Sequence, residues 1–515
     1  MTSSPPFDGL DTKEASSSEL TGDSKPQDEA QRVLAFAQDE PPPTEEECAQ
    51  LVRKVDWVLM PILWMTGGLQ YCDKSALSVG ALFGMIRDLK LYQVGSNGTI
   101  DTFLYSQCAM IFFVGYACGA FPLGAIAQRL PTAKVCAVYC LIWGVVVTAT
   151  PACTSFSGLM AQRFALGFVE AGVSPAFLSI IGAWYTKKEA AMRTTILFSA
   201  NGFVVIPLLL LAWGAVTIGP PEHSWKPLYY FIGGLTILWS AVIYFALPDS
   251  PVTAKFLSPR QRYVAVERLR SNQAGITSKI FKPAQAFSAL LDPKVVLLAL
   301  ITFCVASPGG AVGSFTPLVI QQVYGANPRK TLLLLMPTGV VGGVANIIAG
   351  YVTSRVPNSR CAVFAVFALV SLAGGVLQWK VPLSQKEGIL AGCFIIPAYS
   401  ACLGTMTGLV VSNTAGASRK TAVGSIMFMS NALSNIAAPF FFKKNEVPRY
   451  PTGFLTTVAL LAASICLVGI YALLCSLENS RRDKAAEQGV GSKESPDQPF
   501  SDLTDNENKA FRYIF

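Results

Sequence analysis

The chain is poor in the side chains on which most hydrolytic enzymes depend. Its 515 residues include one histidine, His223, and only 14% of them are charged. A histidine-based triad or a zinc-protease site needs a positioned imidazole, and His223 lies in proline-rich sequence where a plain surface role is expected. The Gly-x4-Gly-Lys-Ser/Thr pattern that holds nucleotide phosphates is also missing. We therefore expect no enzyme activity, and any work the chain does must draw on a gradient.

Cysteine usage and net charge narrow the possibilities further. The 13 cysteines are scattered without a Cys-x2-Cys pair, so neither a disulfide framework nor a zinc site is indicated. The formal net charge of +8 has two explanations, nucleic-acid binding or the basic excess that membrane proteins keep in their cytoplasmic loops. The second is favoured here. We expect no cofactor, no metal ion and no nucleic-acid partner.

Long apolar stretches dominate the rest of the sequence. Hydrophobic residues make up 52% of the chain, and the mean hydropathy is +0.44. A helix needs about 20 mostly apolar residues to cross a bilayer, because the hydrocarbon core is about 30 Å thick and each residue rises about 1.5 Å. We therefore predict an all-α membrane protein with twelve transmembrane helices, over 57–83, 102–124, 133–153, 158–183, 194–216, 228–247, 294–320, 331–352, 361–379, 388–411, 421–442 and 452–475.

A long polar connector divides these stretches into two sets of six. Within it, bases alternate with apolar residues at helical spacing over 258–270, which predicts a short helix on the inner membrane surface. Both ends of the chain are polar and too poor in apolar residues to offset the entropy of ordering. The predicted organisation is a disordered tail over 1–50, an N-terminal bundle over 51–247, a connector over 248–292, a C-terminal bundle over 293–477 and a disordered tail over 478–515.

The distribution of basic residues predicts the orientation. With both termini in the cytosol, roughly twice as many Lys and Arg residues lie near the membrane inside as outside, as the positive-inside rule expects. The glycosylation sequon Asn97-Gly-Thr99 then falls in the first outer loop. We expect a multi-pass protein of the plasma membrane that is a monomer.

An internal repeat supports the division into halves. Residues 124–134 read Gly-x4-Arg-x-Pro-x2-Lys, and residues 350–360 read Gly-x4-Arg-x-Pro-x2-Arg at the equivalent place in the second half. Two unrelated basic loops are the alternative explanation. Matched spacing at matched positions favours duplicated halves, as secondary transporters often show.

Charged residues inside the apolar stretches are the strongest indication of function. A charge at the bilayer centre costs about 2.5–3.5 kcal/mol on insertion scales, so such residues usually face a wet cavity and a partner. We predict that Lys74 and Arg163 bind an anionic substrate and that Asp73 and Glu170 bind the coupling proton. Arg163 and Glu170 lie on one face of a helix, about 10 Å apart along its axis. Structural salt bridges that fix helix packing are the alternative.

Buried asparagines give weaker signals. Asn201 and Asn413 are predicted to contribute to the substrate site. Asn346, Asn431 and Asn435 could also line a cavity, but most such residues hydrogen-bond to a neighbouring helix.

An ordered set of sequence strings carries a family resemblance over about residues 50–477. The chain resembles the major facilitator superfamily, in particular its anion:cation symporter branch and the fungal allantoate permease group. The strings are Tyr-Cys-Asp-Lys over 71–74, Arg-Phe-Ala-Leu-Gly-Phe-Val-Glu-Ala over 163–171, and the segments 184–193, 247–251, 412–420 and 448–453.

The resemblance implies two six-helix bundles around a central cavity, alternating access and proton-coupled uptake of organic anions. Carried over by position, the family's functional residues fall on Tyr71, Asp73, Lys74, Arg163 and Glu170. Many relatives have arginine where this chain has Lys74. Because lysine cannot make the planar bidentate contact with a carboxylate, specificity for sugar acids or sialic acid is not inferred.

The sequence thus predicts a proton symporter that imports a small carboxylate nutrient, with allantoate, another ureido acid, a nicotinate-like acid and a peptide-like anion as candidates. Its partners are the anionic substrate, the proton and the lipid bilayer. Two alternatives stay open, efflux of a secondary metabolite and a nutrient sensor that does not transport.

Overall fold

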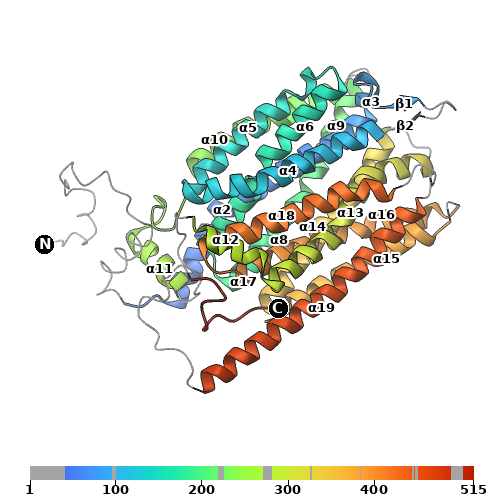
Figure 1. The fold of residues 1–515 in the computed structure, drawn as a ribbon. Helices are drawn as coiled ribbons and strands as arrows, with labels where there is room; N and C mark the ends of the chain where they lie inside the picture. The colour runs from blue at the N-terminus through green and yellow to red at the C-terminus, as the bar shows by residue number, and fades with distance from the viewer. Residues whose placement is uncertain are drawn as a thin grey trace.

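Almost all of the residues that the structure describes are helical. The computed structural model describes residues 41–94, 100–101, 103–218, 225–270, 281–324, 328–382, 384–442, 446, 450–488 and 503–515. Within them, 10 helices are long and apolar enough to cross a membrane. Together with α2 and α18, which carry more polar side chains, they make up the twelve predicted spans. The spans run side by side along one axis of the molecule (Figure 1).

The first half contains six spans. Two of them are interrupted, so that α6 and α7 form the fourth span and α8 and α9 form the fifth. A short hairpin of β1 and β2 follows α3. The bounds are α2 (Glu45–Leu82), α3 (Met85–Asp88), β1 (Gln93–Val94), β2 (Ile100–Asp101), α4 (Phe103–Arg129), α5 (Thr132–Thr148), η2 (Thr150–Ala152), α6 (Phe156–Glu170), α7 (Val173–Trp184), α8 (Lys187–Phe203), α9 (Val205–Ile218) and α10 (Trp225–Ala246).

The connector and the second half follow the same plan. The predicted helix in the connector is confirmed as α11, and a second short helix, α12, precedes the seventh span. The bounds are α11 (Pro259–Arg270), α12 (Pro283–Leu290), α13 (Pro293–Tyr324), α14 (Pro328–Arg355), α15 (Arg360–Lys380), α16 (Lys386–Ile395), η3 (Ile396–Ala398), α17 (Tyr399–Asn413), α18 (Ala417–Phe441) and α19 (Pro451–Glu487).

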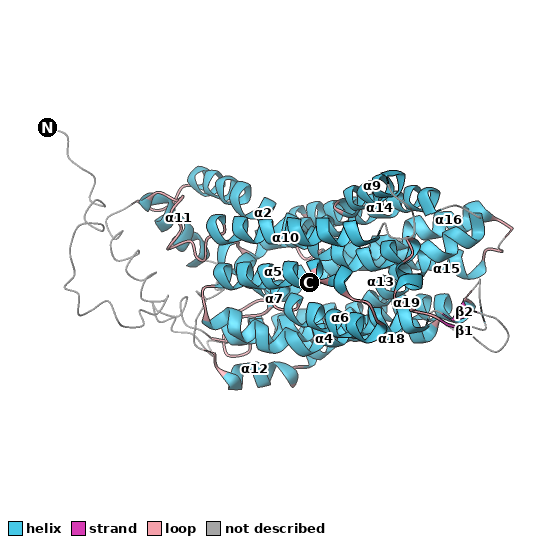
Figure 2. Cartoon of the chain, turned by 90° about the horizontal axis from the view of Figure 1, so that it is seen from above, coloured by secondary structure: helices cyan, strands magenta, loops and turns pink. Residues whose placement is uncertain are grey.

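The two ends of the molecule differ in character. Helices α11 and α12 lie at one end and the β1–β2 hairpin lies at the other (Figures 1 and 2). The helices α8, α15 and α18 begin at the α11 end, with the basic residues Lys187, Arg360 and Arg419 close to their first turns. We call this the basic end and the opposite one the hairpin end.

Glycine lets the two halves touch backbone to backbone between α8 and α14. A Cβ atom added to Gly202 would lie 2.2 Å from the carbonyl oxygen of Gly339 and 2.5 Å from the backbone nitrogen of Gly343. Real side chains do not approach that closely, so only glycine fits at Gly202 without displacing α14. Close contact through small residues is typical of helices in membranes, where van der Waals packing takes the place of the hydrophobic driving force between helices.

Both tails are more ordered than predicted. Thr44 and Glu47 form a reciprocal capping box that starts α2 before residue 50. Helix α19 continues to Glu487, and the segment 503–515 packs against the basic end, where Phe511 and Tyr513 are only 1% and 3% exposed. The prediction of a disordered tail over 478–515 is therefore wrong for these residues, because its polar composition conceals an apolar cluster at the end.

Candidate functional site

A cavity of about 230 Å³ lies between the two halves. Helices α2, α4, α6, α7 and α8 line it from the first half, and α13, α17 and α18 line it from the second. A second cavity of about 140 Å³ shares some of these residues and extends along α2 to Leu82, toward the hairpin end. Nine of the 28 residues that line the first cavity are aromatic, among them Tyr71, Phe112, Phe113 and Tyr399.

Lys74 brings a positive charge to this cavity. Its Nζ lies 2.6 Å from Oε1 of Glu170, and the lysine side chain is 30% exposed while the glutamate is 0% exposed. The same ammonium group stands 5.6 Å from the ring centre of Phe112 and 5.5 Å from that of Tyr116. The cation therefore has the cavity on one side and a buried carboxylate on the other.

The two predicted acidic residues lie behind the cavity wall. Asp73 is 0% exposed, and one of its carboxylate oxygens accepts a hydrogen bond from the indole N–H of Trp143. The other oxygen, Oδ1, has no hydrogen-bond partner among the described residues. Glu170 is close enough to interact electrostatically with Asp73. Two carboxyl groups and one lysine thus form a buried cluster that reaches the cavity only through Lys74.

Arg163 does not pair with Glu170, although both lie on α6. Its Nη2 donates a hydrogen bond to the hydroxyl of Tyr229 at 2.5 Å, and its Nε has no partner among the residues that the structure describes. Arg163 lines the cavity but is only 2% exposed. Among the described residues no carboxylate lies within ion-pair distance of this guanidinium, although its charge still acts on Asp73 and Glu170.

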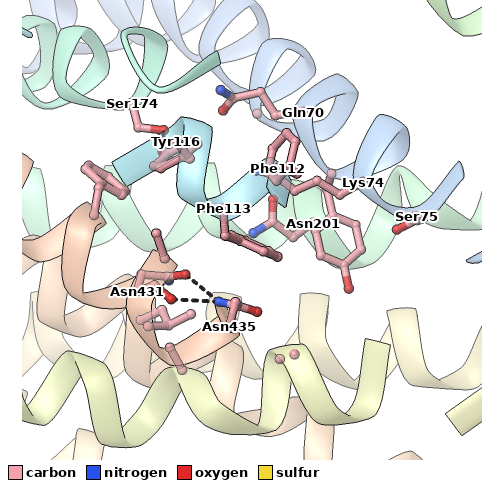
Figure 3. Close-up of a pocket in the computed structure, with 18 of the residues that line it drawn as sticks. Gln70, Lys74, Ser75, Phe112, Phe113, Tyr116, Ser174, Asn201, Asn431 and Asn435 are labelled. Atoms are coloured by element: carbon pink, nitrogen blue, oxygen red, sulfur yellow. Dashed lines mark hydrogen bonds between the residues drawn. The ribbon is translucent and has the colours of Figure 1, made fainter. Parts of the chain in front are cut away.

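Three asparagine side chains line the cavity, contributed by both halves. Asn201 comes from α8, while Asn431 and Asn435 lie one turn apart on α18. Figure 3 shows the asparagine pair on one side of the cavity and Asn201 with Lys74 on the other. The Asn435 amide donates to the backbone oxygen of Asn431 at 2.8 Å and to its Oδ1 at 2.9 Å. This leaves the Asn435 oxygen as an acceptor and the Asn431 amide nitrogen as a donor for other partners.

Asn413 is not in the cavity, so its predicted place in the substrate site is wrong. It lies at the last residue of α17, where its amide donates to the Tyr471 hydroxyl at 2.9 Å and to the Ile514 backbone oxygen at 2.7 Å. The Ile514 backbone N–H donates back to Asn413 at 2.8 Å. Its side chain therefore anchors the 503–515 segment. The predicted glycosylation site, Asn97, lies outside the described residues.

The basic end is closed by contacts between the halves. Arg360 of α15 donates to the backbone oxygen of Lys187 at 2.6 Å. Gln128 of α4 donates to the Ser418 hydroxyl at 3.1 Å, and the Ser425 hydroxyl donates to the Ala120 backbone oxygen at 3.0 Å. The cavity residues of α2, α8 and α18 lie beyond these contacts, toward the hairpin end, so the basic end is sealed below the cavity.

Several residues of the strings that carry the family resemblance have structural partners. Arg193 forms an ion pair with Asp56 at 2.6 Å, and Glu189 forms one with Arg268 of α11 at 2.7 Å. The backbone N–H of Ala133 at the start of α5 donates to Asp249 at 2.8 Å. These contacts tie the connector and the helix ends together at the basic end and contribute nothing to the cavity.

Sequence reasoning missed the aromatic wall of the cavity. Nothing in the sequence distinguishes Phe112, Phe113 or Tyr399 from the aromatic residues that pack between helices or face lipid. In the part of the chain that the structure describes, no group of three or more His, Cys, Asp or Glu side chains could hold a metal ion.

Comparison with known proteins identifies the family of the chain independently of the geometry of the cavity. The model of the family described as Major Facilitator Superfamily matches residues 57–439. An uncharacterized transporter of Schizosaccharomyces pombe is 31% identical over 92% of this chain and 87% of its own length. The allantoate permease of Saccharomyces cerevisiae is 30% identical over 91% of this chain and 87% of its own length.

A solved structure also matches the arrangement of helices. The proton:xylose symporter XylE aligns with a TM-score of 0.60 at 14% identity, covering 84% of this chain and 96% of XylE. At that identity the match concerns the fold alone.

Proposed function

This chain is a transporter that belongs to the Major Facilitator Superfamily, and we propose that it imports a small carboxylate-bearing nutrient together with a proton. The single observation that carries the proposal is the position of Lys74. It is a cation at the cavity wall, and its Nζ lies 2.6 Å from Oε1 of the wholly buried Glu170. Lys74 can therefore pair either with this carboxylate of the protein or with a carboxylate of the substrate.

Proton binding and substrate binding become coupled through this competition. While Glu170 is ionised, it holds Lys74 in an ion pair. When Glu170 takes up a proton, the ammonium group is released toward the cavity, where a substrate carboxylate replaces the lost partner. Each ligand then favours the other, and by linkage the effect is reciprocal. Asp73, close to Glu170 and hydrogen-bonded to Trp143, completes the proton-binding pair.

The cavity chemistry supports an organic acid of moderate size with a polar far end. Lys74 and Arg163 offer positive charge, and the aromatic side chains offer flat surfaces for a planar group. The amides of Asn201, Asn431 and Asn435 offer donors and acceptors to a ureido, amide or ring-nitrogen group. Allantoate is the compound named for a relative of 30% identity, and a ureido acid is the substrate class that we propose to test first.

We further propose that the basic end faces the cytosol of the plasma membrane. The excess of Lys and Arg near this end supports the orientation. Because contacts between the halves seal this end, the conformation described above would be one in which the cytosolic gate is closed. Movement of the halves against each other would then open that gate, as in alternating access.

The test is uptake by a deletion strain that carries the chain or a variant. Growth on single nitrogen and carbon sources identifies the nutrient, and labelled uptake is then measured across a pH series. We expect uptake to rise as the external medium becomes more acidic. Glu170→Gln should abolish this pH dependence and spare exchange of internal for external substrate.

Other outcomes would contradict the proposal in distinct ways. Export from preloaded cells without uptake would indicate an efflux transporter. Equal loss of uptake and exchange in Glu170→Gln would remove Glu170 from proton coupling. Lys74→Ala should raise the KM for the anionic substrate at least tenfold more than the KM for a neutral analogue, since about 1.4 kcal/mol of charge interaction corresponds to tenfold. A parallel change of both KM values would make Lys74 structural.

A further inference from the structure

The segment 503–515 is folded onto the basic end of the molecule. In Figure 1 it runs beside α17 and α12, close to the C-terminal end of the long helix α19 and far from the hairpin end. Phe511 and Tyr513 are buried, and their rings contact each other with centres 5.3 Å apart. Composition alone predicts disorder here, so the order must come from specific contacts with the helices below.

Most of these contacts are made with the second half. The Tyr513 backbone N–H donates to the side chain of Asn479 at 2.9 Å, and the Asn479 amide donates to the Tyr513 backbone oxygen at 2.8 Å. Asn413 makes the same two-way contact with the backbone of Ile514, at 2.7 and 2.8 Å. Arg482 donates to the backbone oxygens of three residues of the segment, 505, 508 and 511. These paired contacts with backbone groups hold the segment in one register against α17 and α19.

A buried charge cluster adds to this anchor. Asp505 lies 2.8 Å from Nε of Arg419, and both side chains are almost wholly buried. Arg419 also pairs with Asp292, which accepts a hydrogen bond from Asn506 at 3.1 Å. The guanidinium therefore holds one carboxylate from the segment and one from the start of α13. Removal of either partner would leave a buried charge uncompensated.

Contact with the first half is centred on Lys187. Its Nζ lies 3.5 Å from the ring centre of Phe511. Its charge also interacts favourably with Asp505 of the segment and unfavourably with Lys420 and Arg360 of the second half. Lys187 is the first residue of α8, and its backbone oxygen accepts hydrogen bonds from Arg360 at 2.6 Å and from Ser412 at 3.2 Å. The segment therefore touches the first half at the same residue that joins the two halves at the closed basic end.

We propose that residues 503–515 form a latch that holds the basic end closed. The segment is bound firmly to the second half and moves with it. Opening of the basic end must carry the second half away from α8 and break the contact between Lys187 and Phe511. The latch thus adds to the stability of the closed state and slows or limits opening. The inference rests on the alternating movement proposed above, but not on the identity of the substrate or the proton site.

The expected size of the effect follows from the contact. Cation–π contacts range from about 0.5 kcal/mol at exposed sites to about 2 kcal/mol when desolvated, so its loss should shift the ratio of closed to open molecules by about twofold to thirtyfold. Deletion of the whole segment should produce at least this shift. Substitution of Phe511 leaves Lys187 in place, so the hydrogen bonds from Arg360 and Ser412 to the Lys187 backbone oxygen stay available.

The test measures the width of the basic end directly. Spin labels are placed on Leu130 and Val356, exposed residues in the matching inner loops of the two halves, after replacement of the exposed Cys118 and Cys466. Distances between the labels are measured by pulsed electron resonance in lipid nanodiscs for the full chain and its variants. No substrate is needed, so a failure of the proposed function in the uptake assay does not decide this experiment.

Two variants and one control decide the outcome. In Phe511→Leu, which removes the aromatic ring but keeps the charge of Lys187, and in a chain without residues 503–515, we expect a larger long-distance population. Arg512→Ala is the matched control, because it removes a positive charge that pairs with the exposed Asp483 and makes no contact with the described residues of the first half. An unchanged distance distribution in Phe511→Leu, in protein that remains folded and monodisperse, would overturn the latch. The same shift in Arg512→Ala would also overturn it.

Discussion

The Lys74–Glu170 pair predicts an asymmetric response to substitution. Lys74→Ala leaves a wholly buried carboxylate without its cation, and loss of one partner of a buried pair costs about 3–5 kcal/mol. Since Lys74 is 30% exposed to the cavity, we take the low end, about 3 kcal/mol. Glu170→Gln leaves a cation that cavity water can solvate, and the cost should fall to about 1 kcal/mol, as for a solvated pair.

The double variant supplies the decisive comparison. In Lys74→Ala with Glu170→Gln the charge of residue 170 is removed together with its cation, so the loss should be close to about 1 kcal/mol rather than the sum of about 4 kcal/mol. The coupling energy is then about 3 kcal/mol, at the upper end for residues in contact. At low pH the deficit of Lys74→Ala should shrink, because a proton neutralises the orphaned carboxylate.

The assay is the recovery of monodisperse protein after heating in detergent, with the four forms compared at pH 5 and pH 8. Chromatography gives the temperature at which half of each form is lost. The reasoning would be refuted if Lys74→Ala and Glu170→Gln were equally destabilised and the double variant lost the sum of both. That pattern would mean that the two side chains pack independently.

The remaining predictions concern other parts of the molecule. Asn413→Ala should leave the substrate KM unchanged but expose residues 503–515 to protease, since it removes two bonds to Ile514; a raised KM would return Asn413 to the substrate site. Gly202→Val should prevent recovery of folded protein, because its Cβ would lie 2.2 Å from the Gly339 backbone oxygen. Gly214→Ala is the control, because a Cβ there meets nothing within 4 Å, and it should leave the recovery of folded protein unchanged. Burial raises the pKa of Asp292, but the charge of Lys294 and hydrogen bonds outweigh burial, so the pKa of Asp292 is lowered on folding. Ionised Asp292 therefore stabilises the folded state at pH values above the ordinary carboxyl pKa, and this stabilisation is lost as the pH falls through the pKa of the folded state. Protease cleavage of residues 503–515 should accordingly increase below about pH 4 in the full chain. In Asp292→Asn, lowering the pH should cause no further increase.

Sequence reasoning located the charges buried among the spans because lipid makes isolated charges expensive. Asp73, Lys74, Arg163 and Glu170 could be picked out as interior residues, and three of them form one cluster. Their pairing could not be predicted. Spacing along α6 placed Arg163 and Glu170 on one face, but α2 supplies the nearer partner, Lys74. Which cation meets which acid depends on the rotation of one helix against another.

The error over Asn413 has a related cause. A polar residue at the end of a span can face a cavity or hold a neighbouring segment, and the sequence alone does not distinguish the two. A signal was present in the last residues of the chain, since Phe511, Tyr513, Ile514 and Phe515 are concentrated in an otherwise polar tail. An apolar cluster of this kind argues against disorder even where the average composition favours it.

The sharing of Lys74 bears on the source of energy for transport. In the proposed cycle the site carries one cation and one anion both before and after loading, because a proton neutralises Glu170 while a monoanion takes its place beside the lysine. A proton and a monoanion together carry no net charge across the bilayer. Uptake would then follow the difference in acidity between the two sides and be indifferent to voltage, so that collapse of the electrical potential at constant pH should leave its rate unaltered.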